Sequence, residues 1–490
     1  MGAAFGGSAR HGAERFLRDM DVCLDLPLQN RDFTISPAPP AARSGLWYKR
    51  AVTDAIKNDV PRAGLVRAIG RWSLAALIVN CIIGSGVFGL PSVIAGYLGR
   101  DSIAAVILAA LAMGVIMACF CEVSSRFTET GGPYLYAREA FGRFMGIQVA
   151  WLVWFVRLTA CAANANLFVT YLGEFWRRAT EPLPRLLILT LLIGILAVIN
   201  FRGVRAGTHM SNIFTAAKLS ALGLVGVAGA WYLIAAGRIV PPARVPATAS
   251  GWTHTMVLLV FAYGGFEAAL ISAGETKNPR RDMPFGLMAA LIACAAVYSL
   301  IQWVVLGVLP DPAHSERPLA DVARLLMGHG GAALIALGAL VSIYGYLSGN
   351  MLATPRITFA LGERGDFPAV FAAVHQRFHT PWFSIFLFAV LVWVLALFGS
   401  FAGNATLSAG SRLFYYGVVC AALPVLRKKQ GPAGLRIPAG MVFSVLGVLI
   451  CVGLLTRIEY EKSVILLVAV AVALVNWAVV RRRKDPRPTA

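Results

Sequence analysis

The fold of this chain is decided by two stretches, CIIGSGVFGLP at 81–91 and FAYGGFEAALI at 261–271. Each lies inside a long apolar segment, and glycine interrupts each one near its middle. In a lipid bilayer every backbone N–H and C=O needs a partner within the protein. A glycine-rich interruption at bilayer depth is therefore costly unless the freed peptide groups bind something. The two interruptions together predict a binding site.

Composition predicts a polytopic membrane protein. The 490 residues are 58% hydrophobic and 14% charged, with a mean hydropathy of +0.69, whereas soluble domains carry about 25% charged residues. The formal net charge of +20 comes from basic residues in the connections between apolar segments. This placement follows the positive-inside rule, by which basic residues gather in the cytoplasmic connections of membrane proteins, and it does not indicate nucleic-acid binding. The eight cysteines lack metal-ligand spacing, so we predict no metal site, no disulfide framework and no cofactor.

We expect an all-α chain of twelve spans, since about 20 apolar residues cross a bilayer. The spans lie at roughly 73–95, 102–122, 145–172, 185–200, 211–236, 253–273, 286–309, 331–361, 382–399, 405–426, 438–456 and 462–480. The breaks fall in the first and sixth spans, and this offset predicts two inverted five-helix repeats. A major-facilitator transporter would instead repeat after six helices.

These spans divide the chain into four regions. Residues 1–66 are polar and Arg-rich without an apolar signal core, which indicates a disordered cytoplasmic tail. The two repeats occupy 67–237 and 250–428, and 429–490 holds the last two helices and a basic tail. Basic residues fill alternate connections, as in 277–281, 427–429 and 481–484. Both termini are therefore expected in the cytoplasm, and the protein in a bacterial-type cytoplasmic membrane.

The two breaks form a clamp for a zwitterion. Unwinding at Gly84, Ser85 and Gly86 would begin a new helix whose free N–H groups can hold a carboxylate. Unwinding around 262–265 would expose carbonyls that accept an ammonium group, with Phe261 at the outer lip. An α-amino acid carries both groups. For either break alone, helix packing through glycine is the alternative explanation.

Charged and polar residues inside the spans are expected to be functional. Lys218 is either a fixed cation that braces spans 1, 5 and 8 or a proton carrier, with snorkelling to the interface as the alternative. Arg157 needs a partner, and Glu267 is one candidate for it. The full predicted substrate site is Ile82, Gly84, Ser85, Gly86, Phe261, Tyr263, Gly264, Asn164 and Asn166. The predicted coupling and gating residues are Lys218, Glu267, Phe261 and Arg157.

Several segments, in order, resemble the amino acid–polyamine–organocation family of permeases, over about residues 67 to 430. They include IIGSGVFGLP (82–91), GGPYLYAREAFG (131–142), the helix that carries Lys218, and FAYGGFEAALISAGETKNPRRDMP (261–284). The resemblance implies a LeuT-like fold and transport by alternating access. Thr128, where relatives often have proline, and Glu363 with Arg364, in place of a commoner A-R-D-G pattern, depart from it.

The resemblance also implies roles for single residues. Ser85 and Gly86 would donate amides to the substrate carboxylate, and the carbonyls of Ile82, Phe261 and Gly264 would accept from its amine. Phe261 corresponds to the aromatic residue that occludes the site. Lys218 matches the lysine that, in sodium-independent relatives, stands in the place of a sodium ion.

We therefore predict a sodium-independent amino acid permease that works by proton symport or exchange. Its partners would be an amino acid, protons and the bilayer, and not nucleic acid. A polyamine or organic-cation exchanger and a transporter-like amino acid sensor are the alternatives. No catalytic constellation is present: Ser85 has no GxSxG context, and the histidines lie in or near loops or in the tail. An enzyme is not expected.

Overall fold

The computed structural model describes residues 69–127, 131–203, 208–237, 246–270, 275–430 and 433–482. Within these ranges the chain is helical, and its extended pairing is one isolated bridge between Ile69 and Thr276. The tail at 1–66 and Thr128 lie outside the described residues.

The helices follow the apolar segments of the sequence and end at glycine, proline or polar turns. They are α3 (Arg71–Ile82), α4 (Gly86–Leu98), α5 (Ser102–Ser124), α6 (Gly132–Phe141), α7 (Arg143–Leu172), α8 (Pro182–Phe201), α9 (Thr208–Ala235), α10 (Ala249–Tyr263), α11 (Phe266–Ala269), α12 (Pro279–Val308), α13 (Pro318–Glu363), α14 (Trp382–Phe398), α15 (Phe401–Lys429), α16 (Gly440–Leu455) and α17 (Tyr460–Val480). Short 3₁₀ turns cover Gly99–Asp101, Arg177–Thr180, Pro312–His314 and Ala369–Ala372.

Among the described residues, eight segments are long and apolar enough to cross a bilayer: Gly86–Ser124, Arg143–Leu172, Pro182–Phe201, Lys218–Ala235, Pro279–Val308, Pro318–Glu363, Phe401–Lys429 and Tyr460–Val480. Three shorter apolar helices accompany them: Arg71–Ile82, Trp382–Phe398 and Gly440–Leu455. Each predicted span overlaps a helix, and the prediction of an all-helical, polytopic membrane protein is confirmed.

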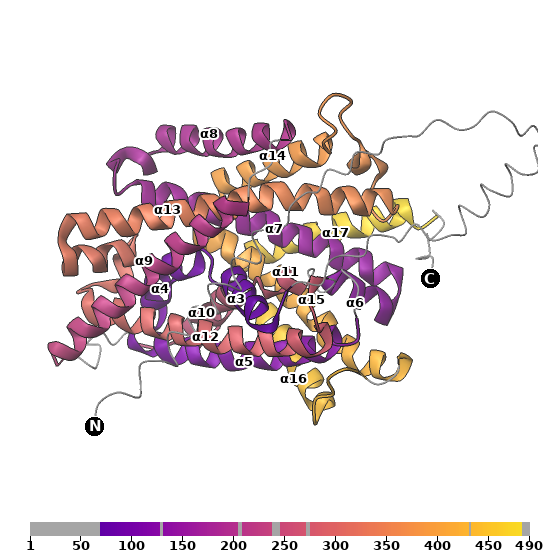
Figure 1. The fold of residues 1–490 in the computed structure, drawn as a ribbon, viewed down its shortest axis with the longest axis horizontal. Coiled ribbons are helices and arrows are strands. Elements are labelled where there is room, and N and C mark those ends of the chain that lie inside the picture. The colour runs from indigo at the N-terminus through magenta and orange to yellow at the C-terminus, as the bar shows by residue number, and fades with distance from the viewer. Residues whose placement is uncertain are drawn as a thin grey trace, which may run out of the picture.

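The long helices run side by side, and the short helices α3 and α11 lie among them (Figure 1). α3 packs against α11 and α12, while α15 packs against α7 and α16. Pro91, Pro284, Pro355 and Pro424 stand inside helices. Such residues are tolerated in membrane helices because neighbouring helices satisfy the freed backbone groups. This packing encloses the broken helices within the bundle.

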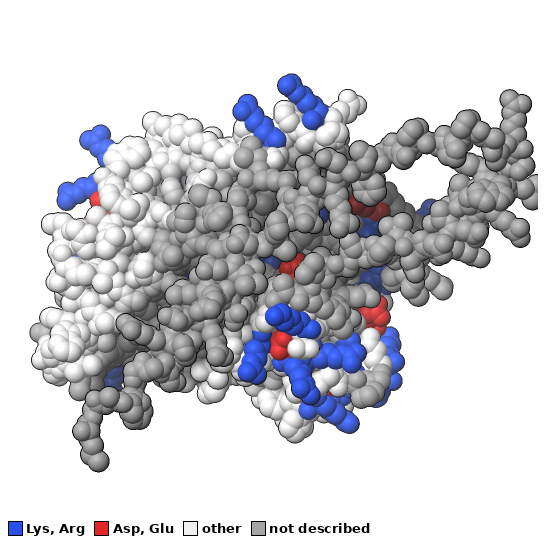
Figure 2. Space-filling view, in the orientation of Figure 1, with Lys and Arg blue, Asp and Glu red and all other residues white. Residues whose placement is uncertain are grey.

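Connections far apart in sequence meet at one end of the bundle around the buried side chain of Asp366. Its carboxylate accepts from Tyr134 (2.6 Å), Arg138 (2.9 Å) and Arg143 (2.8 Å). Its backbone carbonyl accepts from Asn476 Nδ2 at 2.9 Å. The segment after α13 is therefore tied to α6, to the start of α7 and to α17. On the face shown in Figure 2, Lys and Arg gather most densely beside α16.

Another set of connections is joined through Glu174, which follows α7. Its carboxylate forms ion pairs with Arg324 and, at 3.5 Å, with Arg317. These contacts attach the first part of α13, before its kink at Gly328, to α7. Because the pairs lie among partly buried side chains, they are stronger than ion pairs in open solvent.

Candidate functional site

The first predicted break is present between α3 and α4. α3 ends at Ile82 and α4 begins at Gly86, so Ile83, Gly84 and Ser85 separate them. Ile83 has extended dihedral angles, φ −70° and ψ 91°. The first N–H groups of α4 have no acceptor within their own helix. The break therefore presents amide donors from α4 and carbonyl acceptors from the end of α3.

The second break is narrower than predicted. α10 continues through Tyr263, and only Gly264 and Gly265 separate it from α11. Gly265 has φ +112°, a conformation that residues with a Cβ rarely adopt. A Cβ at this position would lie 2.3 Å from the carbonyl oxygen of Cys81. Glycine is required here because the two breaks contact each other through their backbones.

Tyr298 links the two breaks through one hydroxyl group. Its oxygen lies 3.1 Å from the carbonyl of Ile82 and 3.0 Å from that of Ala262. A hydroxyl carries one proton and donates to one of the two carbonyls at a time. When Tyr298 donates to the Ile82 carbonyl, it uses one of the two lone pairs of a predicted acceptor and leaves the other free.

A cavity of about 260 Å³ lies between the breaks. Its lining consists of Asn80, Cys81, Ile82, Gly84, Ser85, Gly86, Arg157, Asn164, Phe261, Ala262, Gly264, Gly265, Ala268, Gly345, Tyr346, Gly349, Asn350 and Arg412. Its volume is slightly below the range of about 300–1,000 Å³ typical of pockets for drug-sized ligands. The cavity therefore suits a smaller solute.

Two polar atoms of the lining have no hydrogen-bond partner among the described residues: Ser85 Oγ and Asn164 Oδ1. Ser85 and Asn164 are 3% and 2% exposed. Buried polar groups in native proteins are nearly always hydrogen-bonded, so an unpartnered one calls for a functional explanation. Ser85 and Asn164 line the same cavity, which is the arrangement expected of a site that binds a polar ligand.

The structure brings seven of the nine predicted substrate residues to this cavity and places Tyr263 and Asn166 elsewhere. The Tyr263 hydroxyl donates to the carbonyl of Val106 at 3.1 Å. The Asn166 amide oxygen accepts from Arg185 at 3.0 Å. On α7, Asn164 and Asn166 are two residues apart, about 200° around the helix. They therefore face opposite sides, and only Asn164 reaches the cavity.

Lys218 is buried beside the first break, not extended toward an interface. The residue is 6% exposed, and its Nζ donates to the carbonyls of Asn80 (2.9 Å) and Ile83 (2.6 Å). These carbonyls belong to the last turn of α3 and to the break itself. The ammonium group therefore satisfies acceptors that the interrupted helix leaves without an amide partner.

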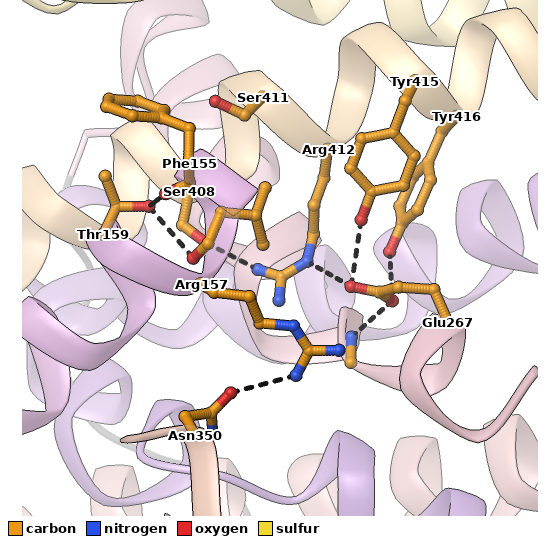
Figure 3. A network of polar contacts seen from close by, with 12 residues as sticks. Phe155, Arg157, Thr159, Glu267, Asn350, Ser408, Ser411, Arg412, Tyr415 and Tyr416 are labelled. Atoms are coloured by element: carbon orange, nitrogen blue, oxygen red, sulfur yellow. Dashed lines mark hydrogen bonds and ion pairs between the residues drawn. The ribbon is translucent and has the colours of Figure 1, made fainter. Parts of the chain in front are cut away.

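Glu267 pairs with Arg412, and not with Arg157, the partner suggested above. Arg412 Nε donates to Glu267 Oε1 at 3.1 Å, while Arg157 Nη1 donates to the amide oxygen of Asn350, also at 3.1 Å (Figure 3). The hydroxyls of Tyr415 and Tyr416 each donate to Glu267 at 3.0 Å.

The Glu267 carboxylate thus holds the second break in place. Its Oε2 also accepts from the backbone N–H of Gly265 at 2.8 Å. Sequence reasoning missed Arg412, although it is an arginine inside the predicted span 405–426 and such residues are functional candidates. Arg412 also lies against the ring of Phe261, with Cζ 5.7 Å from the ring centroid.

A second cavity, of about 310 Å³, lies on the other side of Arg157. Its lining is Gly131, Pro133, Tyr134, Ala150, Val153, Trp154, Arg157, Glu267, Thr354, Arg356, Ile357, Thr358, Ala360, Leu361 and Arg364. Several of these residues come from the end of the bundle where Asp366 lies. Arg157 borders both cavities, so it stands between the first cavity and that end.

Comparison with known proteins agrees with this architecture. Residues 69–478 match the sequence model of the family described as amino acid permease. The chain is 26% identical over 434 residues to the methylthioribose transporter of Bacillus subtilis (strain 168), covering 83% of this chain and 92% of that protein. It is 27% identical over 381 residues to the serine/threonine exchanger SteT of the same organism, covering 75% and 84%. It is 23% identical over 465 residues to the branched-chain amino acid permease BcaP, also from that organism, covering 90% and 98%. The chain therefore belongs to the amino acid permease family of the amino acid–polyamine–organocation superfamily and is a polytopic membrane transport protein.

Proposed function

We propose that the protein moves an α-amino acid across the cytoplasmic membrane by alternating access, without sodium. Twelve spanning helices would form two inverted five-helix repeats followed by α16 and α17, with both termini in the cytoplasm. Support comes from the position of the breaks, one in the first and one in the sixth predicted span. It also comes from relatives that are named as amino acid transporters.

The observation that carries the proposal is the meeting of the two breaks at one cavity. The amides at the start of α4, together with Ser85, would bind the substrate carboxylate. The carbonyls of Ile82 and Gly264 would accept from its ammonium group, and Phe261 would cover it. The unpartnered oxygen atoms of Ser85 and Asn164 support a polar ligand at this place.

Sodium independence rests on Lys218. Its ammonium group donates to the carbonyls of Asn80 and Ile83, the kind of hard oxygen acceptors that a sodium ion would need. A fixed positive charge at these carbonyls leaves no place for a second cation. Transport would then be driven by protons or by exchange of one solute for another.

Uptake of labelled amino acids into proteoliposomes tests the proposal. We expect uptake to persist when sodium is replaced by choline, and Lys218→Ala to abolish or uncouple it. Lys462→Ala, which removes a lysine at the start of α17, serves as the control and should transport normally. Strict sodium dependence would refute the coupling mechanism. Binding without counterflow would instead favour the sensor.

A further inference from the structure

The wall of the first cavity carries an uneven set of charges. Two arginines, Arg157 and Arg412, belong to its lining, which includes no aspartate or glutamate among the described residues. A guanidinium group remains protonated in proteins at any ordinary pH. The charge of the site is therefore set by which of the two arginines has a counter-charge within the protein.

Arg412 is neutralised by Glu267. Its Nε forms an ion pair with Glu267 Oε1 at 3.1 Å, and its Nη1 donates to Ser408 Oγ at 2.8 Å. Each oxygen of the Glu267 carboxylate already accepts two hydrogen bonds. Glu267 is thus fully engaged by its own neighbours and is not available to a ligand.

Arg157 has no ion pair of its own among the described residues, because the nearby Glu267 carboxylate is already paired with Arg412. Its hydrogen bond goes to Asn350, a neutral amide, at 3.1 Å. In the part of the chain that the structure describes, no carboxylate lies within 4.0 Å of its guanidinium group as an ion-pair partner. Removing a charge from water without a partner is unfavourable. The cavity therefore retains one positive charge that an anionic group of the substrate would balance.

We infer that Arg157 binds a second carboxylate of the substrate, so that the transporter prefers dicarboxylic amino acids such as glutamate and aspartate. This inference rests on the proposed function, in which the start of α4 binds the α-carboxylate. Arg157 borders both cavities and so stands at the inner side of the site, apart from the α4 amides. A planar guanidinium group suits bidentate binding of a carboxylate.

The same charge disfavours the cationic alternatives. A lysine or arginine side chain, or the second amine of a polyamine, would lie beside Arg157 without any free carboxylate in the cavity wall. The ammonium of Lys218 adds to this repulsion, because one of its hydrogen-bond partners, Asn80, lines the cavity. A protein charge of the same sign as the ligand, placed at the binding site, is a common means of excluding that ligand.

Counterflow into proteoliposomes that contain the full-length protein tests the inference. Labelled L-glutamate is the probe, and unlabelled L-glutamine, L-alanine and L-lysine are the competitors. Glutamate and glutamine are nearly isosteric, so the comparison isolates the charge. Since a hydrogen bond to a charged group contributes about 1.5–3 kcal/mol, we expect glutamate to be favoured over glutamine by about 10–100-fold, and lysine to compete least.

Variants test whether Arg157 causes the preference for glutamate over glutamine. Arg157→Gln should lower the glutamate preference by the same factor while uptake of glutamine persists, and Arg157→Lys should restore part of it. Arg100→Gln, at a 3₁₀ turn outside both cavities, is the control and should leave the preference unchanged. Thermal unfolding of each variant in detergent verifies folding, and ligand-induced stabilisation by glutamate provides a second measurement.

The outcomes are distinguishable. If the wild-type protein carries neutral amino acids as well as or better than glutamate, the inference is wrong and the proposed function stands. If Arg157→Gln folds and keeps the full glutamate preference, the inference is also wrong. If the folded wild-type protein carries no amino acid at all, both the inference and the proposed function fail.

Discussion

Replacing Glu267 by glutamine should destabilise the protein strongly, because it leaves Arg412 buried without a counter-charge. Arg412 Nε lies 3.1 Å from Glu267 Oε1. With an effective dielectric constant of about 20, two unit charges at this distance attract each other by about 5 kcal/mol. Breaking one partner of a buried ion pair typically costs about 3–5 kcal/mol, so we expect a loss of this size in the free energy of unfolding.

The glutamine side chain also fits the surrounding donors poorly. Four groups now donate to the carboxylate, those of Gly265, Arg412, Tyr415 and Tyr416. An amide offers one acceptor oxygen with two lone pairs, so about two donors would lose their acceptor. The geometry of the second break, which depends on the Gly265 N–H, would loosen, and transport should fall together with stability.

A double-mutant cycle measures the interaction between the two charges. Unfolding is followed by tryptophan fluorescence during titration with a denaturing detergent, for wild type, Glu267→Gln, Arg412→Gln and the double variant. The double variant should be more stable than the sum of the two single losses predicts, since it buries no unpaired charge. If Glu267→Gln is as stable as wild type, or if the losses simply add, the ion pair does not hold the break.

Two further predictions concern the second break and the Asp366 contacts. Gly265→Ala should lower the free energy of unfolding by about 1–3 kcal/mol or more and abolish uptake, since φ is +112° and the new Cβ would clash with the Cys81 carbonyl. Gly194→Ala is the control, because a Cβ at Gly194 would have no atom within 4 Å. Equal uptake by both variants would contradict the argument. Burial and the Asp366 carboxylate raise the pKa of Tyr134 from 10.0 to about 12, so its contribution to stability is present below pH 10 and is lost as pH rises through about 12. The stability difference between wild type and Tyr134→Phe, followed by circular dichroism, should therefore be constant below pH 10 and shrink as pH rises from 10 toward 12. A difference that does not change across this range would refute the argument.

The sequence was sufficient for features that are local in the chain. Glycine marked both helix breaks to within about two residues, because a residue without Cβ is needed where backbones touch. Lys218 was identified because a lysine inside an apolar segment is costly and needs a reason. The inverted repeat stays a prediction, since it was inferred from the order of the spans.

Features that depend on how distant helices rotate against each other could not be predicted. Glu267 and Arg412 are 145 residues apart, and the pairing depends on how α15 packs beside the second break. Tyr263 was predicted to bind substrate and lies between the cavity residues Phe261 and Gly264, yet its side chain points to α5. Periodicity shows which residues share a face of a helix, but it does not show which neighbour that face meets.

The position of Arg157 in the linings of both cavities has a consequence for the leakage of water between them. Among the described residues, Arg157 is the one that lines both cavities, and a hydrogen bond to Asn350 holds its side chain there. Rotamer changes of accessible side chains take picoseconds to nanoseconds, whereas movements of whole helices take microseconds to milliseconds. If this side chain changed rotamer, the two cavities would connect without movement of a helix, and water would exchange between them faster than the helices move. The barrier to proton leakage would then depend on residues other than Arg157.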